Sequence, residues 1–175
     1  MHNPFIKVLL PLAAIIIVIL LTKYKFHYSL NEDLQLRPPL FFPMILWILI
    51  SIAWMMVTDY LFNWRGPWDF TTWKAQPLYV SAIRVTAVCF LGPVAEELIF
   101  RGIMFRRLER LKKFPQWLII IILAAGWALL HYSYSPEVIG IIFIDGILLG
   151  AALLHTRSLI VPIMMHISWN LYAIW

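Results

Sequence analysis

Six apolar stretches, each close to the length of a membrane-spanning helix, constrain what this chain can fold into. Hydropathy places them at about residues 5–22, 39–61, 77–105, 115–134, 137–155 and 158–174. A helix needs roughly 20 apolar residues to cross the hydrocarbon core of a bilayer. Of the 175 residues, 62% are hydrophobic and 13% are charged, and a core of this size could not bury so much apolar surface. The sequence therefore predicts an all-α, polytopic membrane helix bundle of about six transmembrane helices.

The first stretch is expected to remain in the protein as a membrane helix. A cleaved signal peptide would end in a small-x-small site, whereas this stretch continues into the sequence KYKFHYSL. Prolines lie near the start of four later stretches, where the first turn of a helix tolerates a missing N–H. The tryptophan-rich segment NWRGPWDFTTWKAQP suits an interfacial loop between the second and third spans.

Basic residues are unevenly distributed among the loops. Those that follow the first, third and fifth spans are Lys23, Lys25, Arg37, Arg106, Arg107, Arg110, Lys112, Lys113 and Arg157. Six alternating spans bring these residues to one side, and the positive-inside rule predicts that this side is cytoplasmic and that both termini are outside. The net charge of +5 therefore bears on orientation in the lipid bilayer, and we expect no nucleic-acid partner.

Three charged residues in the sequence GPVAEELIFRG lie at membrane depth, where an ionisable group is costly. Glu97 and Arg101 stand four residues apart with the acid on the N-terminal side, which is the favourable order for an ion pair on a helix. Glu96 points about 100° away from that pair and is expected to face a cavity without a partner. A desolvated carboxylate takes up a proton more readily, as a general base must. The alternative is a salt-bridged helix end near the interface.

Two further polar clusters lie on later spans. His131 ends the sequence GWALLH, with Trp127 one turn earlier, and His166 and Asn170 share a helix face in HISWN. Taken separately, these side chains are more often core residues or polar contacts between helices than catalysts. A histidine beside a carboxamide can also offer N–H donors to a developing oxyanion. Together with a carboxylate base, the clusters provide the groups that water needs to attack an amide.

The sequences EELIFR, WALLH and HISWN resemble, in this order, the three motifs of the CPBP (Abi or CAAX-protease-like) family of intramembrane proteases. The family pattern is Glu-Glu-x-x-x-Arg, then Phe-x-x-x-His, then His-x-x-x-Asn, on successive core helices. The matching residues here are Glu96, Glu97, Arg101, Trp127, His131, His166 and Asn170. The resemblance covers about residues 77–175. Trp127 departs from the usual phenylalanine, a change that affects the fine shape of the pocket.

This resemblance implies a glutamic-type endopeptidase whose last four helices form a conical catalytic cavity. Residues 1–76 would form two transmembrane helices and the interfacial loop, and residues 77–175 the catalytic core. The first glutamate and the histidine of the second motif would activate water, and the third motif would form the oxyanion hole. The implied catalytic residues are Glu96, His131, His166 and Asn170. The implied supporting residues are Glu97, Arg101 and Trp127.

A metal-dependent mechanism is the alternative, because the family was long described as metalloproteases. Glu96, His131 and His166 could form a zinc set of two histidines and one carboxylate. Against zinc, the chain has no H-E-x-x-H motif, and the three ligands would come from three different helices. We therefore expect a metal-free enzyme without a cofactor.

Depth along the helices gives a further expectation. With a rise of about 1.5 Å per residue, Glu96 lies roughly 15 Å from Arg106, whereas His131 lies roughly 24 Å from the start of the fourth span. Either the fourth span begins later and tilts, or the basic stretch 106–113 continues the third helix beyond the lipid, and we predict the latter. Asp145 lies in mid-span outside the motifs, and we expect it to line the substrate path or bond to a neighbouring helix, without a catalytic role.

The implied substrate is a membrane-anchored peptide or protein, processed at its C-terminus or matured in the manner of a sorting signal or bacteriocin. The short chain suggests a multi-pass protein of a bacterial inner membrane. A non-catalytic immunity or scaffold protein of the same fold is a competing function, although such a protein would have lost motif residues that are present here. A small transporter would use Glu96 and Asp145 as proton carriers, but no convincing pair of inverted repeats is visible.

Overall fold

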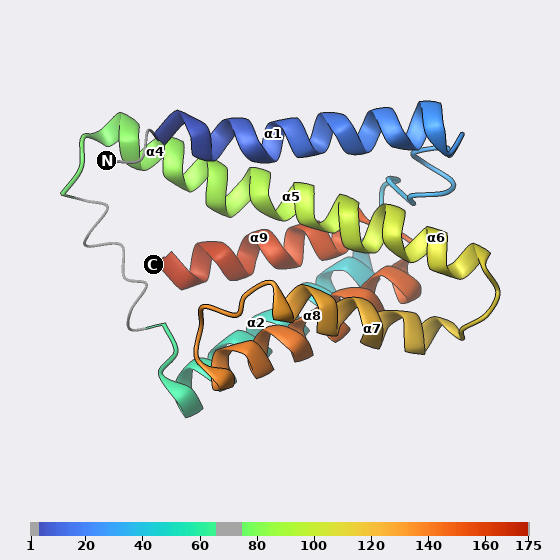
Figure 1. Cartoon of the computed structure of the whole chain (residues 1–175). Helices are drawn as coiled ribbons and strands as arrows, with labels where there is room; N and C mark the ends of the chain where they lie inside the picture. Colours follow the sequence, from blue (N-terminus) through green and yellow to red (C-terminus); the bar gives the residue numbers. More distant parts are fainter. Residues whose placement is uncertain (1–3, 66–74, 175) are drawn as a thin grey trace.

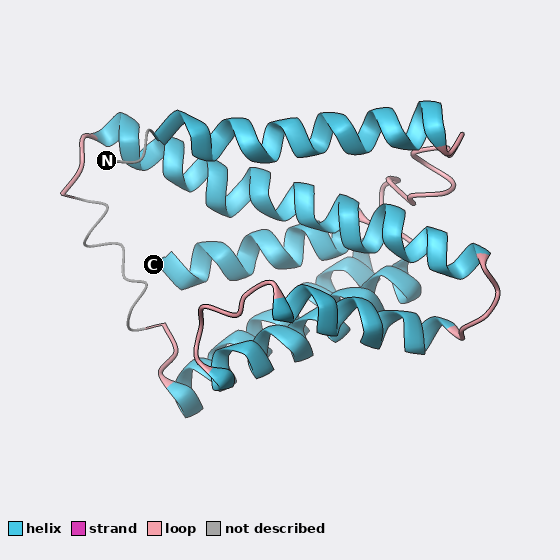
Figure 2. Ribbon diagram, in the orientation of Figure 1, coloured by secondary structure: helices cyan, strands magenta, loops and turns pink. Residues whose placement is uncertain are grey.

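The structure, a computed structural model, describes residues 4–65 and 75–174, which form helices and loops without any strand (Figures 1 and 2). The elements are α1 (Pro4–Leu20), η1 (Leu21–Lys25), α2 (Phe41–Phe62), α4 (Leu78–Val85), η3 (Thr86–Leu91), α5 (Gly92–Glu97), η4 (Leu98–Met104), α6 (Phe105–Arg110), α7 (Gln116–Leu129), α8 (Pro136–Thr156) and α9 (Ile160–Ile174). Within the described residues, four continuous helices are long and apolar enough to cross a membrane, whereas α7 and α9 are apolar but shorter. The expected all-α membrane helix bundle is confirmed.

The third long helix runs without interruption from Leu78 to Arg110, as 33 residues. The expectation that the basic stretch continues this helix is therefore confirmed as far as Arg110. Two π-helical segments, η3 and η4, widen it on either side of α5, which carries the paired glutamates. Pro93 accounts for the first, because a proline inside a helix removes one N–H donor and pushes away the preceding turn.

The fourth span is shorter than expected, and His131 is not on a helix. Helix α7 ends at Leu129, so its 14 residues extend about 21 Å. The N–H of Leu130 is shared between the carbonyls of Gly126 and Trp127, a tightened turn typical of a helix end. Ser135 then caps the next helix through its side chain, and a proline begins that helix. Residues 130–135 consequently form a turn that carries His131.

Helices α7 and α8 approach each other closely because α8 has glycines at the contact. A Cβ atom on Gly146 would lie 2.9 Å from the Cβ of Ala124, and one on Gly150 would lie 2.8 Å from Cγ2 of Ile120. Small residues allow such an approach in membrane bundles, where van der Waals packing drives helix association. The contact holds the turn after α7 against the centre of the bundle.

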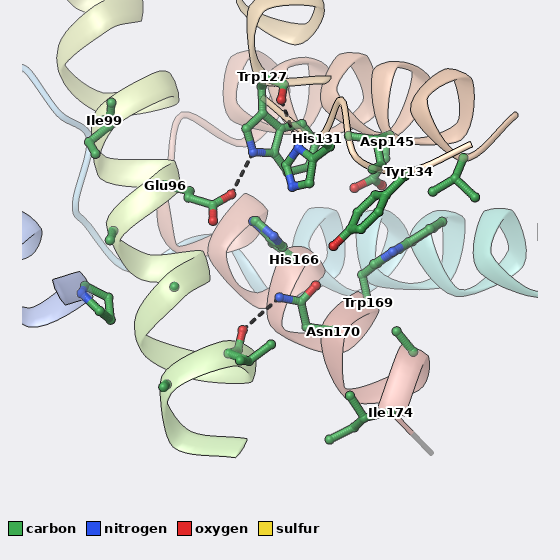
Figure 3. A pocket seen from close by; sticks show the side chains of 18 of the residues that line it. Glu96, Ile99, Trp127, His131, Tyr134, Asp145, His166, Trp169, Asn170 and Ile174 are labelled. Atoms are coloured by element: carbon green, nitrogen blue, oxygen red, sulfur yellow. Dashed lines mark hydrogen bonds between the residues drawn. The ribbon is translucent and has the colours of Figure 1, made fainter. Parts of the chain in front are cut away.

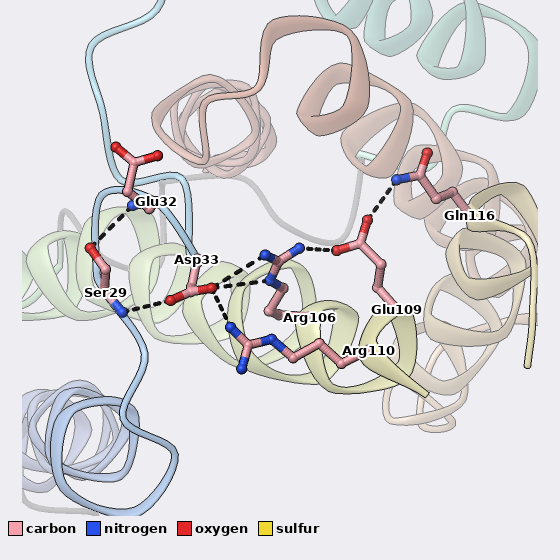
Figure 4. Close-up of polar contacts among 7 residues, drawn as sticks. All are labelled: Ser29, Glu32, Asp33, Arg106, Glu109, Arg110 and Gln116. Atoms are coloured by element: carbon pink, nitrogen blue, oxygen red, sulfur yellow. Dashed lines mark hydrogen bonds and ion pairs between the residues drawn. The ribbon is translucent and has the colours of Figure 1, made fainter. Parts of the chain in front are cut away.

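The basic loops meet at one end of the bundle, opposite the start of α1 and the end of α9 (Figure 1). Arg37 donates through Nε to the carbonyl of Arg157 at 2.8 Å. Arg106 and Arg110 both donate to Oδ1 of Asp33, at 3.2 and 2.5 Å (Figure 4). The expected alternation of six helical segments therefore brings the three basic groups together. The cytoplasmic location of this end stays a prediction.

Candidate active site

A cavity of about 560 Å³ lies at the centre of the bundle (Figure 3). Apolar side chains form most of its wall. The ionisable, phenolic or amide side chains that line it are Lys7, Glu96, His131, Tyr134, Asp145, His166 and Asn170. The last four spans provide most of the lining, as expected. Leu10 and Pro11 of α1 and Trp64 after α2 line it as well, so the N-terminal helices also shape the cavity.

Glu97 lies behind the cavity wall at the centre of a buried polar network. Its Oε1 accepts hydrogen bonds from Nη1 of Arg101 at 2.9 Å and from Nδ1 of His166 at 3.0 Å. The Nη2 group of Arg101 donates to the carbonyl of Gly146 at 3.1 Å. Glu97 is 0% exposed and Arg101 3% exposed, and together they form the ion pair that their spacing predicts. The network ties the third long helix to α8 and α9.

Glu96 faces the cavity but has a partner, which corrects the expectation that it would have none. The indole Nε1 of Trp127 donates to its Oε2 at 2.7 Å (Figure 3). An indole N–H is a donor only, so this bond fixes one carboxylate oxygen and leaves the other for a water or substrate group. In the CPBP family that the motifs resemble, phenylalanine is usual at the position that corresponds to Trp127, and its side chain has no such donor. The replacement of phenylalanine by Trp127 therefore adds a hydrogen bond to Glu96 as well as changing the shape of the pocket.

The Trp127 ring contacts the other motif residues and is 3% exposed. The imidazoles of His131 and His166 pack edge-on against it, with ring centroids 5.4 and 5.2 Å away. The Arg101 guanidinium carbon lies 4.7 Å from its centroid, a distance typical of a cation–π contact. Trp127 therefore positions the groups of all three motifs.

The hydrogen bonds of the two histidines determine which ring nitrogen carries a proton. Nδ1 of His131 lies 2.9 Å from the carbonyl oxygen of Trp127, which can only accept, so Nδ1 carries the hydrogen. Nδ1 of His166 is bonded to the Glu97 carboxylate in the same sense. Each ring presents Nε2 as its remaining group, and this nitrogen accepts when the ring is neutral and donates only when the ring is doubly protonated.

Asn170 completes the hydrogen bonding of the widened helix. Its Nδ2 donates to the carbonyl of Val88 at 2.9 Å. The N–H of Gly92 bonds to Ala87, five residues earlier, and the same π-type pairing would give Val88 the N–H of residue 93, which is a proline. Asn170 supplies the missing donor. It therefore makes the polar contact between helices that the sequence predicts as the alternative to a catalytic role. One amide N–H and Oδ1 remain for other partners.

All seven expected site residues lie at this cavity or directly behind it. Five line it: Glu96, Trp127, His131, His166 and Asn170. Asp145 also lines it, is 2% exposed, and has no hydrogen-bond partner for Oδ1 among the described residues. Sequence reasoning missed Tyr134, and the only signal was its place three residues after His131, just before the cap of α8.

The zinc alternative requires side chains that are arranged to hold a metal ion. In the described ranges, no group of three His, Cys, Asp or Glu side chains is arranged to hold a metal ion. The proposed zinc set of Glu96, His131 and His166 is thus not preassembled here. A hydrogen bond from Nδ1 orients a histidine for a metal as well as for a water molecule, so the metal-free mechanism stays a proposal.

The sequence model of one protein family, described as Type II CAAX prenyl endopeptidase Rce1-like, matches residues 78–172. The matched region begins with the first residue of α4 and ends within α9, and it includes all seven site residues. Neither a curated protein nor a solved structure matches the chain.

Proposed function

Because the chain belongs to the Rce1-like family of type II CAAX prenyl endopeptidases, which are intramembrane proteases, we propose that Glu96 and His131 activate water to hydrolyse a peptide bond. The observation that supports this mechanism is the difference in hydrogen bonding between the adjacent residues Glu96 and Glu97. The Glu97 carboxylate is engaged by Arg101 and His166, whereas the Glu96 carboxylate is held by one bond at the cavity wall. Of these two glutamates, Glu96 is therefore the one that can reach a water molecule in the cavity.

The reaction transfers one proton through Glu96. As the water oxygen bonds to the carbonyl carbon, Glu96 takes a proton from the water and the carbonyl electrons move onto oxygen. When the tetrahedral intermediate collapses, the carbon–nitrogen bond breaks and the leaving nitrogen receives the proton from Glu96. His131 accepts a hydrogen bond through Nε2 and thereby orients the water, because its Nδ1 is already bonded to Trp127.

The oxyanion would be stabilised by the third motif. The second N–H of Asn170 is available after its bond to Val88, and it is a neutral donor. His166 can contribute from Nε2 in its doubly protonated form only. Glu97 and Arg101 support the site by holding His166 and by joining the helices around the cavity.

The substrate we propose is a membrane-anchored peptide or protein with a cleavable C-terminal segment. A CAAX-type sequence on a prenylated cysteine is the first candidate, because the matching family is described by that substrate. A sorting signal or a bacteriocin precursor is the second, if the protein lies in a bacterial inner membrane. The mostly apolar wall of the cavity suits a lipid-associated chain.

The test uses detergent-purified protein and a panel of quenched fluorogenic peptides, some ending in farnesyl-cysteine followed by three residues and some carrying another lipid anchor. Wild type is compared with His131→Ala, and with His155→Ala as a matched control, since His155 bonds to Trp47 away from the cavity. Each reaction is run with and without a strong zinc chelator. Cleavage that resists chelation and is lost in His131→Ala supports the glutamate mechanism.

Two other outcomes would contradict the proposal. Loss of cleavage on chelation, restored by zinc, would make the site residues metal ligands instead. A protein that binds the anchored peptides but cleaves none of them would favour the non-catalytic immunity or scaffold function.

A further inference from the structure

One phenol outside the sequence motifs faces the same cavity. Tyr134 lies on the turn after α7, and its N–H donates to the carbonyl of His131 at 3.0 Å. The rings of Tyr134 and His131 lie 5.6 Å apart with a 40° tilt, and the Tyr134 ring packs against the main apolar core. The turn and the ring contacts therefore give this side chain a defined position beside a motif residue.

The Tyr134 side chain is directed so that its hydroxyl group faces the catalytic motif residues. In Figure 3, the Tyr134 hydroxyl points into the cavity, toward the space in front of His166 and Asn170. Burial raises the pKa of the phenol, and the negative charge of Glu96 raises it further. Tyr134 therefore enters any reaction at neutral pH as a protonated O–H group.

The third motif alone provides fewer neutral hydrogen-bond donors than an oxyanion hole commonly combines. One N–H of Asn170 is occupied by Val88, which leaves a single amide donor. His166 adds a donor only when its ring is doubly protonated, because Nδ1–H is bonded to Glu97. Oxyanion holes in acyl transfer commonly combine two donors in a fixed arrangement. A phenolic O–H supplies the second donor without any change in ring protonation.

We propose that Tyr134 is a catalytic residue that donates a hydrogen bond from its hydroxyl to the oxyanion of the tetrahedral intermediate, together with Asn170. The inference rests on the hydrolysis proposed above. The proton stays on the phenol throughout: the bond strengthens as the carbonyl oxygen gains charge and weakens when the carbon–nitrogen bond breaks. The water proton still passes through Glu96 to the leaving nitrogen.

The test compares Tyr134→Phe with Tyr132→Phe on the farnesyl-cysteine peptides. The first change removes one oxygen atom and keeps the ring that packs against His131. Tyr132 lies on the same turn but is exposed and does not line the cavity, so it is the matched control. We expect kcat to fall by about 10²-fold in Tyr134→Phe with KM unchanged, as for loss of one oxyanion donor, and Tyr132→Phe to behave as wild type.

A binding measurement separates this role from packing. A phosphinate peptide, which imitates the tetrahedral intermediate, should lose about as much affinity in Tyr134→Phe as kcat loses, while the cleaved product peptide should bind as before. Unfolding temperatures of the purified variants control for folding, and the affinity ratio between phosphinate and product is independent of the fraction folded.

The outcomes distinguish this inference from the function on which it rests. If wild type cleaves the peptides and Tyr134→Phe matches it, the inference is overturned and the hydrolysis stands. An increase in KM alone, with equal loss of phosphinate and product affinity, also overturns it, because Tyr134 would then bind substrate. If wild type cleaves no peptide of the panel, the proposed function fails and takes the inference with it.

Discussion

Two clusters of charged side chains lie along the same long helix and are built in opposite ways. At the cavity, Arg101 and Glu97 are buried, and each is bonded to a further helix through Gly146 or His166. Nine residues after Arg101, Arg110 reaches Asp33 in a loop, and 47% of the Arg110 side chain is exposed. Water can replace any partner lost from the second cluster, but it cannot reach the first.

The two clusters show that an ion pair can hold helices in place or can simply attract exposed side chains. Exposed pairs contribute about 0–1 kcal/mol, so the basic end gains little stability from its many contacts. A buried pair is costly to assemble, but breaking it leaves a charge without water or a partner. We infer that the pair at the cavity fixes helices around Glu96, whereas the basic end mainly orders a loop.

The largest effect expected from this difference follows removal of one buried partner. Arg101→Met leaves the Glu97 carboxylate buried without its cation, and we expect a loss of about 3–5 kcal/mol of folding stability together with loss of activity. The matched control is Arg110→Met, on the same helix, for which we expect at most about 1 kcal/mol. Thermal unfolding of the two variants in detergent measures the contrast. Equal losses would mean that burial does not distinguish the clusters.

The next effect tests the close helix contact on which the buried cluster depends. Gly146→Ala would place a Cβ atom 2.9 Å from the Cβ and 3.1 Å from the Cα of Ala124, so the helices must separate. We expect a loss of about 1–3 kcal/mol and a fall in activity, since overpacking a dense contact is costly. Gly140→Ala, on the same helix with open space around it, should be neutral or slightly stabilising. Unchanged stability of Gly146→Ala would show that the contact is loose.

A smaller effect concerns the bond that holds the reactive carboxylate. Trp127→Phe keeps an aromatic ring against both histidines but removes the donor to Glu96, and we expect kcat to fall about tenfold, equivalent to about 1.4 kcal/mol. Trp54→Phe is the control, because its Nε1 is buried without a partner among the described residues. Steady-state cleavage assays compare the two. If both variants match wild type, the bond from Trp127 has no catalytic value.

The smallest effect lies at the basic end. Burial raises the pKa of Asp33, but hydrogen bonds from the Ser29 N–H and from Arg110 and Arg106 outweigh it, and the net pKa lies below 3.8. A carboxyl group with a lowered pKa stabilises the fold above pH 3.8, and this contribution is lost as the pH falls through the lowered value.

Asp33→Asn should therefore lower stability by less than about 1 kcal/mol at neutral pH and low salt. The difference from wild type should shrink in high salt and in acid. Glu32→Gln, an exposed neighbour, is the control. Unfolding curves at two pH values and two salt concentrations give the result, and a difference that persists in acid would show that the effect is not electrostatic.

The sequence predicted the helical segments and the grouping of the motifs well, because both depend on regular spacing. Apolar stretches are readable from composition, and the pair Glu97–Arg101 follows from the four-residue period of a helix. The end of α7 at Leu129 was not predicted, since the apolar pattern continues into the turn. Helix ends depend on local hydrogen bonds and on the proline that follows, which hydropathy does not register.

Contacts between distant segments could not be predicted from spacing. The bond between Trp127 and Glu96 joins residues 31 positions apart, and that between Asn170 and Val88 joins residues 82 positions apart. The second exists because Pro93 lacks an N–H in a helix widened to a π form, a local distortion with a distant consequence. Tyr134 was missed for a similar reason, because a turn, not a helix period, directs it into the cavity.

The most direct test of the account compares the adjacent glutamates, using cleavage of an anchored peptide and thermal unfolding for each variant. We predict that Glu96→Gln lowers kcat by about 10³-fold or more and leaves the unfolding temperature close to that of wild type. Glu97→Gln should lower the unfolding temperature strongly, because Arg101 and His166 then lose their shared carboxylate. An active Glu96→Gln enzyme, or a Glu97→Gln variant as stable as wild type, would contradict the account in which Glu96 is catalytic and Glu97 is structural.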